Sequence, residues 1–145
     1  MKRIVFVLFT ALVFIASSCE LETVGNGKLD GMWHLVSVDT LLTDGRTDMS
    51  GERIYWSVQQ RLLLAEDKSG QYANVLFRFE HSDGKLRLFD PYFYDRENGD
   101  KPITDVFMLT FFGINSLDET FTIESLDGSR MVLCSPELRL SFRKM

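Results

Sequence analysis

The chain has 145 residues, of which 45% are hydrophobic, with a formal net charge of −5 and two cysteines. This length suits a single domain with a buried core, and the excess of acidic residues excludes the basic surface that nucleic-acid binding needs. An acidic protein is also repelled by anionic lipid, so no electrostatic contact with a membrane surface is expected.

The first 18 residues have the layout of a secretory signal peptide. Lys2 and Arg3 precede an apolar run from Ile4 to Ala16, and two serines then lead to Cys19. The apolar run is shorter than the roughly 20 residues that a membrane-spanning helix needs. A cysteine directly after small residues predicts cleavage before Cys19 and lipidation of its thiol. An ordinary secretion signal and a membrane-tethered signal anchor are the alternative interpretations.

Lipidation at Cys19 predicts a protein of the cell envelope, anchored to the outer membrane on a face that the sequence leaves open. Residues 19–30 are polar, acidic and glycine-bearing, which is typical of a flexible tether. Glu20 and Glu22 resemble a signal for display on the cell surface. With Cys19 modified, Cys134 has no disulfide partner, and we expect it to be a buried strand thiol.

From Trp33 onward, hydrophobic and polar residues alternate with a period of two, as in half-buried β-strands. Trp33, Leu35 and Ser37 are expected to face one side of the first strand. Residues 53–66 indicate one long extended stretch, bent near Gln59 and Gln60, and residues 82–84 indicate a tight turn. Further alternating segments lie at 75–81, 85–88, 120–124, 130–135 and 138–143. Sequential antiparallel strands with short turns predict a meander that closes to hide its edges.

Residues 95–116 break this pattern. A polar loop over residues 95–102 is followed by Thr104 and Asp105, which can cap one or two helical turns ending at Gly113 in a left-handed conformation. Another strand is the alternative, since residues 106–112 are rich in β-forming side chains.

The first strand and the last strand carry a recognisable pair of features. Gly31-Met32-Trp33 resembles the glycine-x-tryptophan start of lipocalins. In lipocalins the tryptophan closes the floor of the barrel and an arginine from the final strand lies across it. Arg139 and Arg143 are the two positions that resemble this arginine.

A broader resemblance covers almost the whole mature chain. The segments LDGMWHLVSV, RIYWSVQ, RFEHSDGKLRLFDPY, GSRMVL and LRLSFRK are similar to lipocalin-like lipoproteins of Bacteroides-type bacteria. The resemblance implies an all-β fold over residues 31–145: an antiparallel up-and-down meander closed into a lipocalin-like barrel of about eight strands, with at most one short helix. That family has no established activity, so the resemblance implies no catalytic residue.

The polar residues do not indicate an enzyme or a metal site. His34 and His81 are far apart and lack the spacing of a zinc motif, and there is no Gly-x-Ser-x-Gly elbow. The spacing of an acidic group around one loop does not match a calcium-binding EF-hand, and we expect a solvated loop. This group comprises Asp90, Asp95, Glu97, Asp100 and Asp105. We therefore predict no catalytic residue, no metal and no cofactor.

Aromatic residues are more informative, because they exceed what a few core contacts need. Tyr92-Phe93-Tyr94 lies beside a polar loop, which suggests the rim of a barrel where an amphipathic ligand binds. Core filling is the alternative role for these side chains. The residues predicted to contact a ligand are Trp56, Phe77, Phe79, Tyr92, Tyr94 and Phe107.

Two functions follow from these observations. The first is a membrane-anchored module that binds a small hydrophobic or amphipathic molecule, such as a fatty acid, an isoprenoid or a bile-acid-like compound. The alternative is a solidly packed barrel that acts as a structural or protein-interaction module of the cell envelope. Whether the barrel interior is open or filled distinguishes the two.

Overall fold

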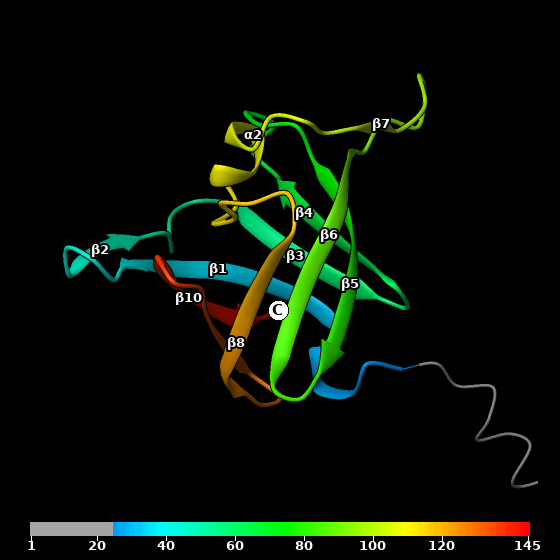
Figure 1. Ribbon diagram of the computed structural model, residues 1–145. Helices are drawn as coiled ribbons and strands as arrows, with labels where there is room; N and C mark the ends of the chain where they lie inside the picture. Colours follow the sequence, from blue (N-terminus) through cyan, green and yellow to red (C-terminus); the bar gives the residue numbers. More distant parts are fainter. Residues whose placement is uncertain (1–24) are drawn as a thin grey trace, which may run out of the picture.

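One antiparallel sheet makes up most of the protein (Figure 1). A computed structural model describes residues 25–145. A short 3-10 turn, η1 (Gly27–Leu29), precedes the sheet, and one α-helix, α2 (Phe107–Thr110), lies among the described residues. The strands are β1 (Gly31–Thr40), β2 (Gly45–Asp48), β3 (Ile54–Gln59), β4 (Leu62–Asp67), β5 (Val75–Ser82), β6 (Lys85–Phe93), β7 (Lys101–Pro102), β8 (Glu119–Leu126), β9 (Arg130–Cys134) and β10 (Leu138–Lys144).

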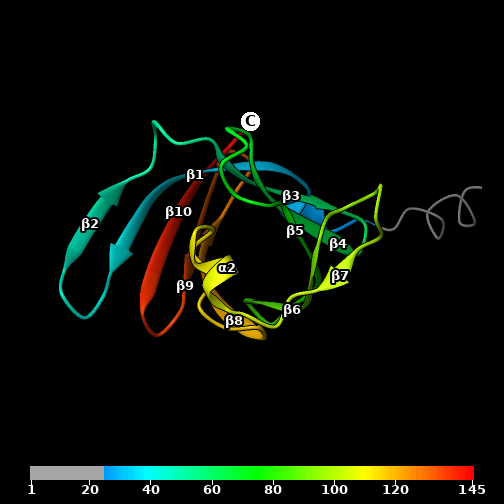
Figure 2. The ribbon, with the colours of Figure 1, turned by 90° about the horizontal axis from the view of Figure 1, so that it is seen from above.

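The sheet closes into a barrel, because β10 pairs with β1 as well as with β9. The closed antiparallel barrel has 8 strands, which confirms the predicted fold class. The short strands β2 and β7 add to β1 and β6 and are not part of the ring. In the view from above, β2 projects from the barrel with the end of β1 (Figure 2). Closure leaves the ring with no exposed strand edge.

The two ends of the barrel differ in their connections. Strand direction alternates, so tight turns at residues 60–61, 83–84 and 127–129 share one end, here called the floor, together with η1. The longer connections, residues 41–53, 68–74, 94–118 and 135–137, share the other, here called the loop end. Helix α2 lies over the loop end, while the chain enters the described structure at the floor (Figure 1).

The predicted single stretch over residues 53–66 is wrong, since it forms two strands. Gln59 pairs with Leu62, which leaves Gln60 and Arg61 as a two-residue turn. Gln60 takes a φ of 56°, and its carbonyl oxygen accepts a hydrogen bond from Asn26 Nδ2 at 2.7 Å. The sequence lacks the asparagine or glycine that usually marks such a turn. The expected turn at residues 82–84 is confirmed.

A β-bulge changes the orientation of β1 partway along. Trp33 and Leu35 point into the barrel as expected, and both are fully buried. The register with β10 then shifts, so that Ser37 lies opposite Ser141 and Val38 lies opposite the buried Leu140. Paired residues point to the same face, so Val38 faces inward and Ser37 outward. The expectation that Ser37 shares a face with Trp33 and Leu35 is therefore wrong.

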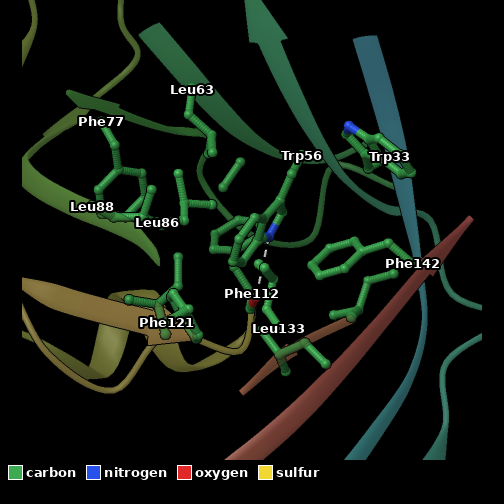
Figure 3. Packing of buried hydrophobic residues seen from close by; sticks show 14 of the residues in the cluster. Trp33, Trp56, Leu63, Phe77, Leu86, Leu88, Phe112, Phe121, Leu133 and Phe142 are labelled. Carbon is green, nitrogen blue, oxygen red and sulfur yellow. Dashed lines mark hydrogen bonds between the residues drawn. The ribbon is translucent and has the colours of Figure 1, made fainter. Parts of the chain in front are cut away.

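The interior of the barrel is filled by large side chains (Figure 3). Trp56 is fully buried, with its ring 4.7 Å from Phe142 and 5.8 Å from Phe121. Three residues of the α2 segment, Leu109, Phe112 and Ile114, are also fully buried and pack into the same core. Close packing of this kind leaves no open cup along the barrel axis.

Helix α2 confirms the helical interpretation of residues 104–112. The Asp105 carboxylate accepts a hydrogen bond from the Phe107 N–H at 3.0 Å, as expected for a residue that caps a first turn. Gly113 ends the turn with a φ of 85°. A Cβ at this position would lie 2.8 Å from a methyl group of Leu140, so only glycine fits both the conformation and the space.

At the floor, the tryptophan is in its expected place but its cation is different. The Trp33 indole N–H donates to the Leu29 carbonyl at 2.8 Å, and Lys144 Nζ lies 5.3 Å from the ring centroid. Arg139 instead pairs with Glu124 on the outer face, and Arg143 is exposed. The prediction that Arg139 or Arg143 crosses the tryptophan is wrong, because alternation along β10 places Lys144 opposite Trp33.

The end of the predicted tether and Cys134 both pack differently from the expectation. Leu29 is fully buried, so the packed barrel includes the last residues of the predicted tether. Cys134 is half-buried on the outer face, next to Glu124 and Arg139, and is not a core thiol. Burial and the Glu124 carboxylate raise the pKa of the Cys134 thiol. Residues 1–24, including Cys19, lie outside the described residues.

Replacement of Gly31 by alanine is expected to destabilise the floor. Gly31 has a φ of 126°, and an added Cβ would meet Lys144 Cε at 2.7 Å, which pushes the cation away from Trp33. Strain of this kind costs about 1–3 kcal/mol in the free energy of unfolding, measurable by urea denaturation. Gly51→Ala is the control, since its Cβ meets nothing and should change stability by less than about 0.5 kcal/mol. Equal stability of the two variants would contradict this account of Gly31.

Candidate functional site

A pocket of about 390 Å³ lies at the loop end of the barrel. It lies between the end of β1, the β2 hairpin, the β4–β5 loop, α2 and the start of β10. A volume of this size is within the range of small-molecule sites. Its lining residues are Val38, Thr47, Met49, Glu52, Ile54, Gln71, Tyr72, Thr110, Phe111, Gly113 and Leu138.

One wall of the pocket is an aromatic pair. The rings of Tyr72 and Phe111 stack with centroids 3.8 Å apart and planes at 13°. Phe107 then meets Phe111 edge-on at 5.2 Å. The stack joins the β4–β5 loop to α2, so the wall is built by two segments far apart in the sequence.

The β4–β5 loop is held by one buried carboxylate, Asp67. Its oxygens accept hydrogen bonds from the backbone N–H groups of Ser69, Gln71 and Tyr72 at 2.9–3.0 Å, and from the Ser69 hydroxyl. Burial acts to raise the pKa of Asp67, but these hydrogen bonds outweigh it and the pKa lies below its ordinary value. Asp67 thereby fixes the two loop residues that line the pocket.

The opposite wall is held by backbone contacts of the β2–β3 connection. The Met49 N–H donates to the Val36 carbonyl at 2.9 Å, and the Glu52 N–H donates to the Met49 carbonyl at 3.0 Å. The buried His34 ring approaches the Glu52 carbonyl at 2.8 Å through Nε2. Hydrogen bonds within the chain therefore hold both walls of the pocket.

The third side of the pocket is fastened to the core. The Trp56 indole N–H donates to the Phe112 carbonyl at 3.2 Å (Figure 3). Phe112 lies between Phe111 and Gly113, which both line the pocket. The indole of Trp56 therefore holds this part of the wall from inside the barrel, although Trp56 itself does not face the pocket.

The residues predicted to contact a ligand are not brought together. Trp56 and Phe77 are buried in the core, and Phe79 is half-buried near the floor beside Asn26. Tyr92 lies on the outer face opposite Leu76.

The other two predicted contacts are at the loop end but outside the pocket. Tyr94 is 38% exposed with the Arg96 guanidinium 4.8 Å from its ring, and Phe107 is 60% exposed. Phe107 touches the pocket only through Phe111. Neither side chain lines the pocket itself.

The sequence carries a further signal for the pocket in the order of its connections. In an up-and-down meander, every second connection lies at the same end of the barrel. Tyr72 and Phe111 both fall in long connections of that end, whereas Trp56 and Phe77 fall within strands. Counting the parity of the connections would have favoured Tyr72 and Phe111 over Trp56 and Phe77.

Acidic residues of the β6–β7 connection accept hydrogen bonds from the backbone of the same loop. The Asp95 carboxylate accepts from the N–H groups of Glu97 and Asn98 at 3.1 Å, and the Asp100 carboxylate accepts from the Asp95 N–H at 2.9 Å. Among residues 25–145, no group of three or more histidine, cysteine or acidic side chains is arranged to hold a metal ion. None of the helices in this part of the chain is long and apolar enough to cross a bilayer.

Comparison with known proteins agrees with the barrel. The family model described as a lipocalin-like domain matches residues 12–145. The chain belongs to this lipocalin-like family. Among curated proteins, none matches this lipocalin-like protein.

Two solved structures share the fold. A lipocalin-like protein from Bacteroides uniformis superposes with a TM-score of 0.63 at 19% identity, covering 82% of this chain and all of its own. An uncharacterized protein from Bacteroides eggerthii gives a TM-score of 0.56 at 20% identity, covering 80% of this chain and 98% of its own. Likeness at this level of identity shows the architecture alone. The expected resemblance to lipocalin-like proteins is thus confirmed.

Removal of the Asp67 carboxylate is expected to loosen the pocket wall. Asp67→Ala leaves the N–H groups of Ser69, Gln71 and Tyr72 without their acceptor, at a cost of about 1–3 kcal/mol in the free energy of unfolding at pH 7. Because the folded-state pKa is lowered, the contribution is complete above the unfolded pKa of about 4 and disappears as the pH falls through the folded value. Thermal unfolding from pH 7 to pH 2.5 should show the two proteins converging in acid. A constant difference across that range would contradict the role of the charge.

Proposed function

We propose that this protein is an anchored lipocalin-like lipoprotein that binds a small amphipathic molecule in the pocket at the loop end. The observation that carries the proposal is a pocket whose walls are held by hydrogen bonds within the chain, with Tyr72 and Phe111 on one side and Met49 and Glu52 on the other. The filled interior supports a site at the rim, where a ligand would lie across the mouth of the barrel and not along its axis.

The composition of the lining supports an amphipathic ligand. Val38, Ile54 and Leu138 form an apolar base next to the aromatic stack, while Thr47 and Gln71 offer polar atoms. Small-molecule sites combine mainly apolar walls with a few placed polar groups in this way. A molecule with one apolar part and one polar end satisfies both halves of the lining.

The proposed anchor is the lipidated Cys19, which would hold the protein at the cell envelope, with the outer membrane as the expected membrane. Acyl chains supply stable attachment where the acidic surface does not. Since the described chain begins at the floor, the tether would join the barrel opposite the pocket. The pocket would then open away from the attached end.

Filling the pocket is expected to abolish ligand binding. N-Phenyl-1-naphthylamine, an uncharged apolar dye, should gain fluorescence with the native protein, and Thr47→Trp should reduce its affinity at least tenfold. Thr47 lines the pocket on β2, opposite Val38, and a strand tolerates tryptophan well. The measurement is a fluorescence titration at fixed ionic strength.

The matched control for this titration is Arg46→Trp, which adds the same indole to the outer face of the same strand, where Arg46 lies 3.5 Å from Asp39. Dye affinity should be unchanged in that variant. Equal dye binding by the native protein and both variants would overturn the pocket as the site and favour a packed barrel that serves as an interaction module.

Replacement of Cys19 by serine is expected to release the protein from the membrane. Without the thiol, no acyl chain can be attached at this position, so the protein loses its lipid anchor. Metabolic labelling with an alkyne-bearing fatty acid should mark the native chain and not Cys19→Ser, and the variant should move to the soluble fraction. Cys134→Ser is the control and should label normally. Labelling of Cys19→Ser would refute the anchor.

For the native protein, protease treatment of intact cells distinguishes the two faces of the outer membrane. Digestion would support the display on the surface suggested by Glu20 and Glu22, and protection would place the protein on the periplasmic side.

A further inference from the structure

The polar side chains at the rim of the pocket include one carboxylate and several neutral donors and acceptors. Glu52 is the charged residue among those that line the pocket, and its carboxylate offers acceptor oxygens only when ionised. The Thr110 hydroxyl already donates to the Phe107 carbonyl at 2.7 Å, which leaves it free to accept but not to donate. Thr47, Gln71 and Tyr72 each offer both a donor and an acceptor, so the charge in the lining comes from the Glu52 carboxylate alone.

The cations of this region do not offset Glu52. Arg46 lies on the opposite face of β2, beside Asp39, and Arg53 is not part of the lining. Glu137, which precedes the pocket residue Leu138, adds a further carboxylate at the loop end. Asp48 does not contribute in the same way, because it shares the outer face of β2 with Arg46.

The aromatic wall is suited to the same kind of ligand. The face of an aromatic ring attracts a cation through its quadrupole, and Tyr72 and Phe111 present a stacked pair in the pocket that also holds Glu52. A cationic head near Glu52 with an apolar body on Val38 and Leu138 would use every part of the lining.

We infer that the pocket selects an amphiphile whose polar end is an amine or ammonium group, and disfavours anionic amphiphiles. This inference rests on the proposed function, and it excludes fatty acids and bile-acid-like anions as preferred ligands. Because Glu52 is exposed to solvent, the charge effect is modest and depends on ionic strength.

Three ligands with one apolar chain and different heads test the inference. Dodecylammonium, dodecanol and dodecanoate would compete with N-phenyl-1-naphthylamine for the native protein at pH 7 and low salt. Each would be used at concentrations at which it is dissolved as a monomer. Dodecylammonium is expected to displace the dye at about threefold to fivefold lower concentration than dodecanol, and dodecanoate is expected to be the weakest. In 0.5 M salt these differences should shrink, because exposed charges are screened.

Glu52→Gln identifies the residue responsible. This variant keeps the shape of the side chain and the backbone contact to His34, and it should remove most of the advantage of dodecylammonium while leaving dodecanol unchanged. Glu97→Gln removes an equal charge from the exposed β6–β7 connection and should leave the order of the three heads intact. Circular dichroism would verify that both variants are folded.

The outcomes separate the two proposals. Dye binding that is blocked by Thr47→Trp, together with equal competition by the three heads or preference for dodecanoate, overturns the charge selection and leaves the proposed function standing. Dye binding that ignores Thr47→Trp overturns both. A preference for dodecylammonium that persists in Glu52→Gln also overturns the inference, since another group would then be responsible.

Discussion

The hydrogen bond from the Trp56 indole to the Phe112 carbonyl connects the barrel core to the segment that closes its mouth. Around it, Leu109, Phe112 and Ile114 are fully buried and occupy the space that a ligand along the barrel axis would need. A buried indole N–H without a partner would be costly, so the same contact satisfies Trp56 and orients the chain after α2. The position of the pocket at the rim, and the placement of Phe111 in its wall, both follow from this arrangement.

The rim pocket is stabilised by polar contacts that lie behind its lining. Asp67 orders the β4–β5 loop through backbone N–H groups, and His34 meets the Glu52 carbonyl behind the opposite wall. Neither side chain lines the pocket. Because these hydrogen bonds leave the loops few alternative conformations, the pocket has a well-defined shape.

At the floor, the cation that lies over the tryptophan differs from the one that the resemblance implies. Gly31 and Trp33 occupy the positions that the lipocalin-like resemblance implies, yet Lys144 and not an arginine lies over the indole. A lysine contributes a point charge and an apolar stem, whereas an arginine would add planar stacking and several directed donors. The close approach of the Lys144 stem to Gly31 leaves no room for a side chain at that position.

Local periodicity and turn-forming residues were enough to predict the all-β meander and its closure. The glycine-tryptophan floor followed from the resemblance to lipocalins, and the short helix before Gly113 was favoured while a strand remained the alternative. The sequence did not determine the hairpin at Gln60, since a non-glycine residue there takes a left-handed conformation with help from the distant Asn26. The bulge in β1, and with it the orientation of Val38, arises from pairing with β10. Closure of the barrel placed Trp56 and Phe77 in the core and Tyr72 and Phe111 in the pocket wall. Burial of an aromatic ring depends on the residues that lie opposite it in the closed barrel.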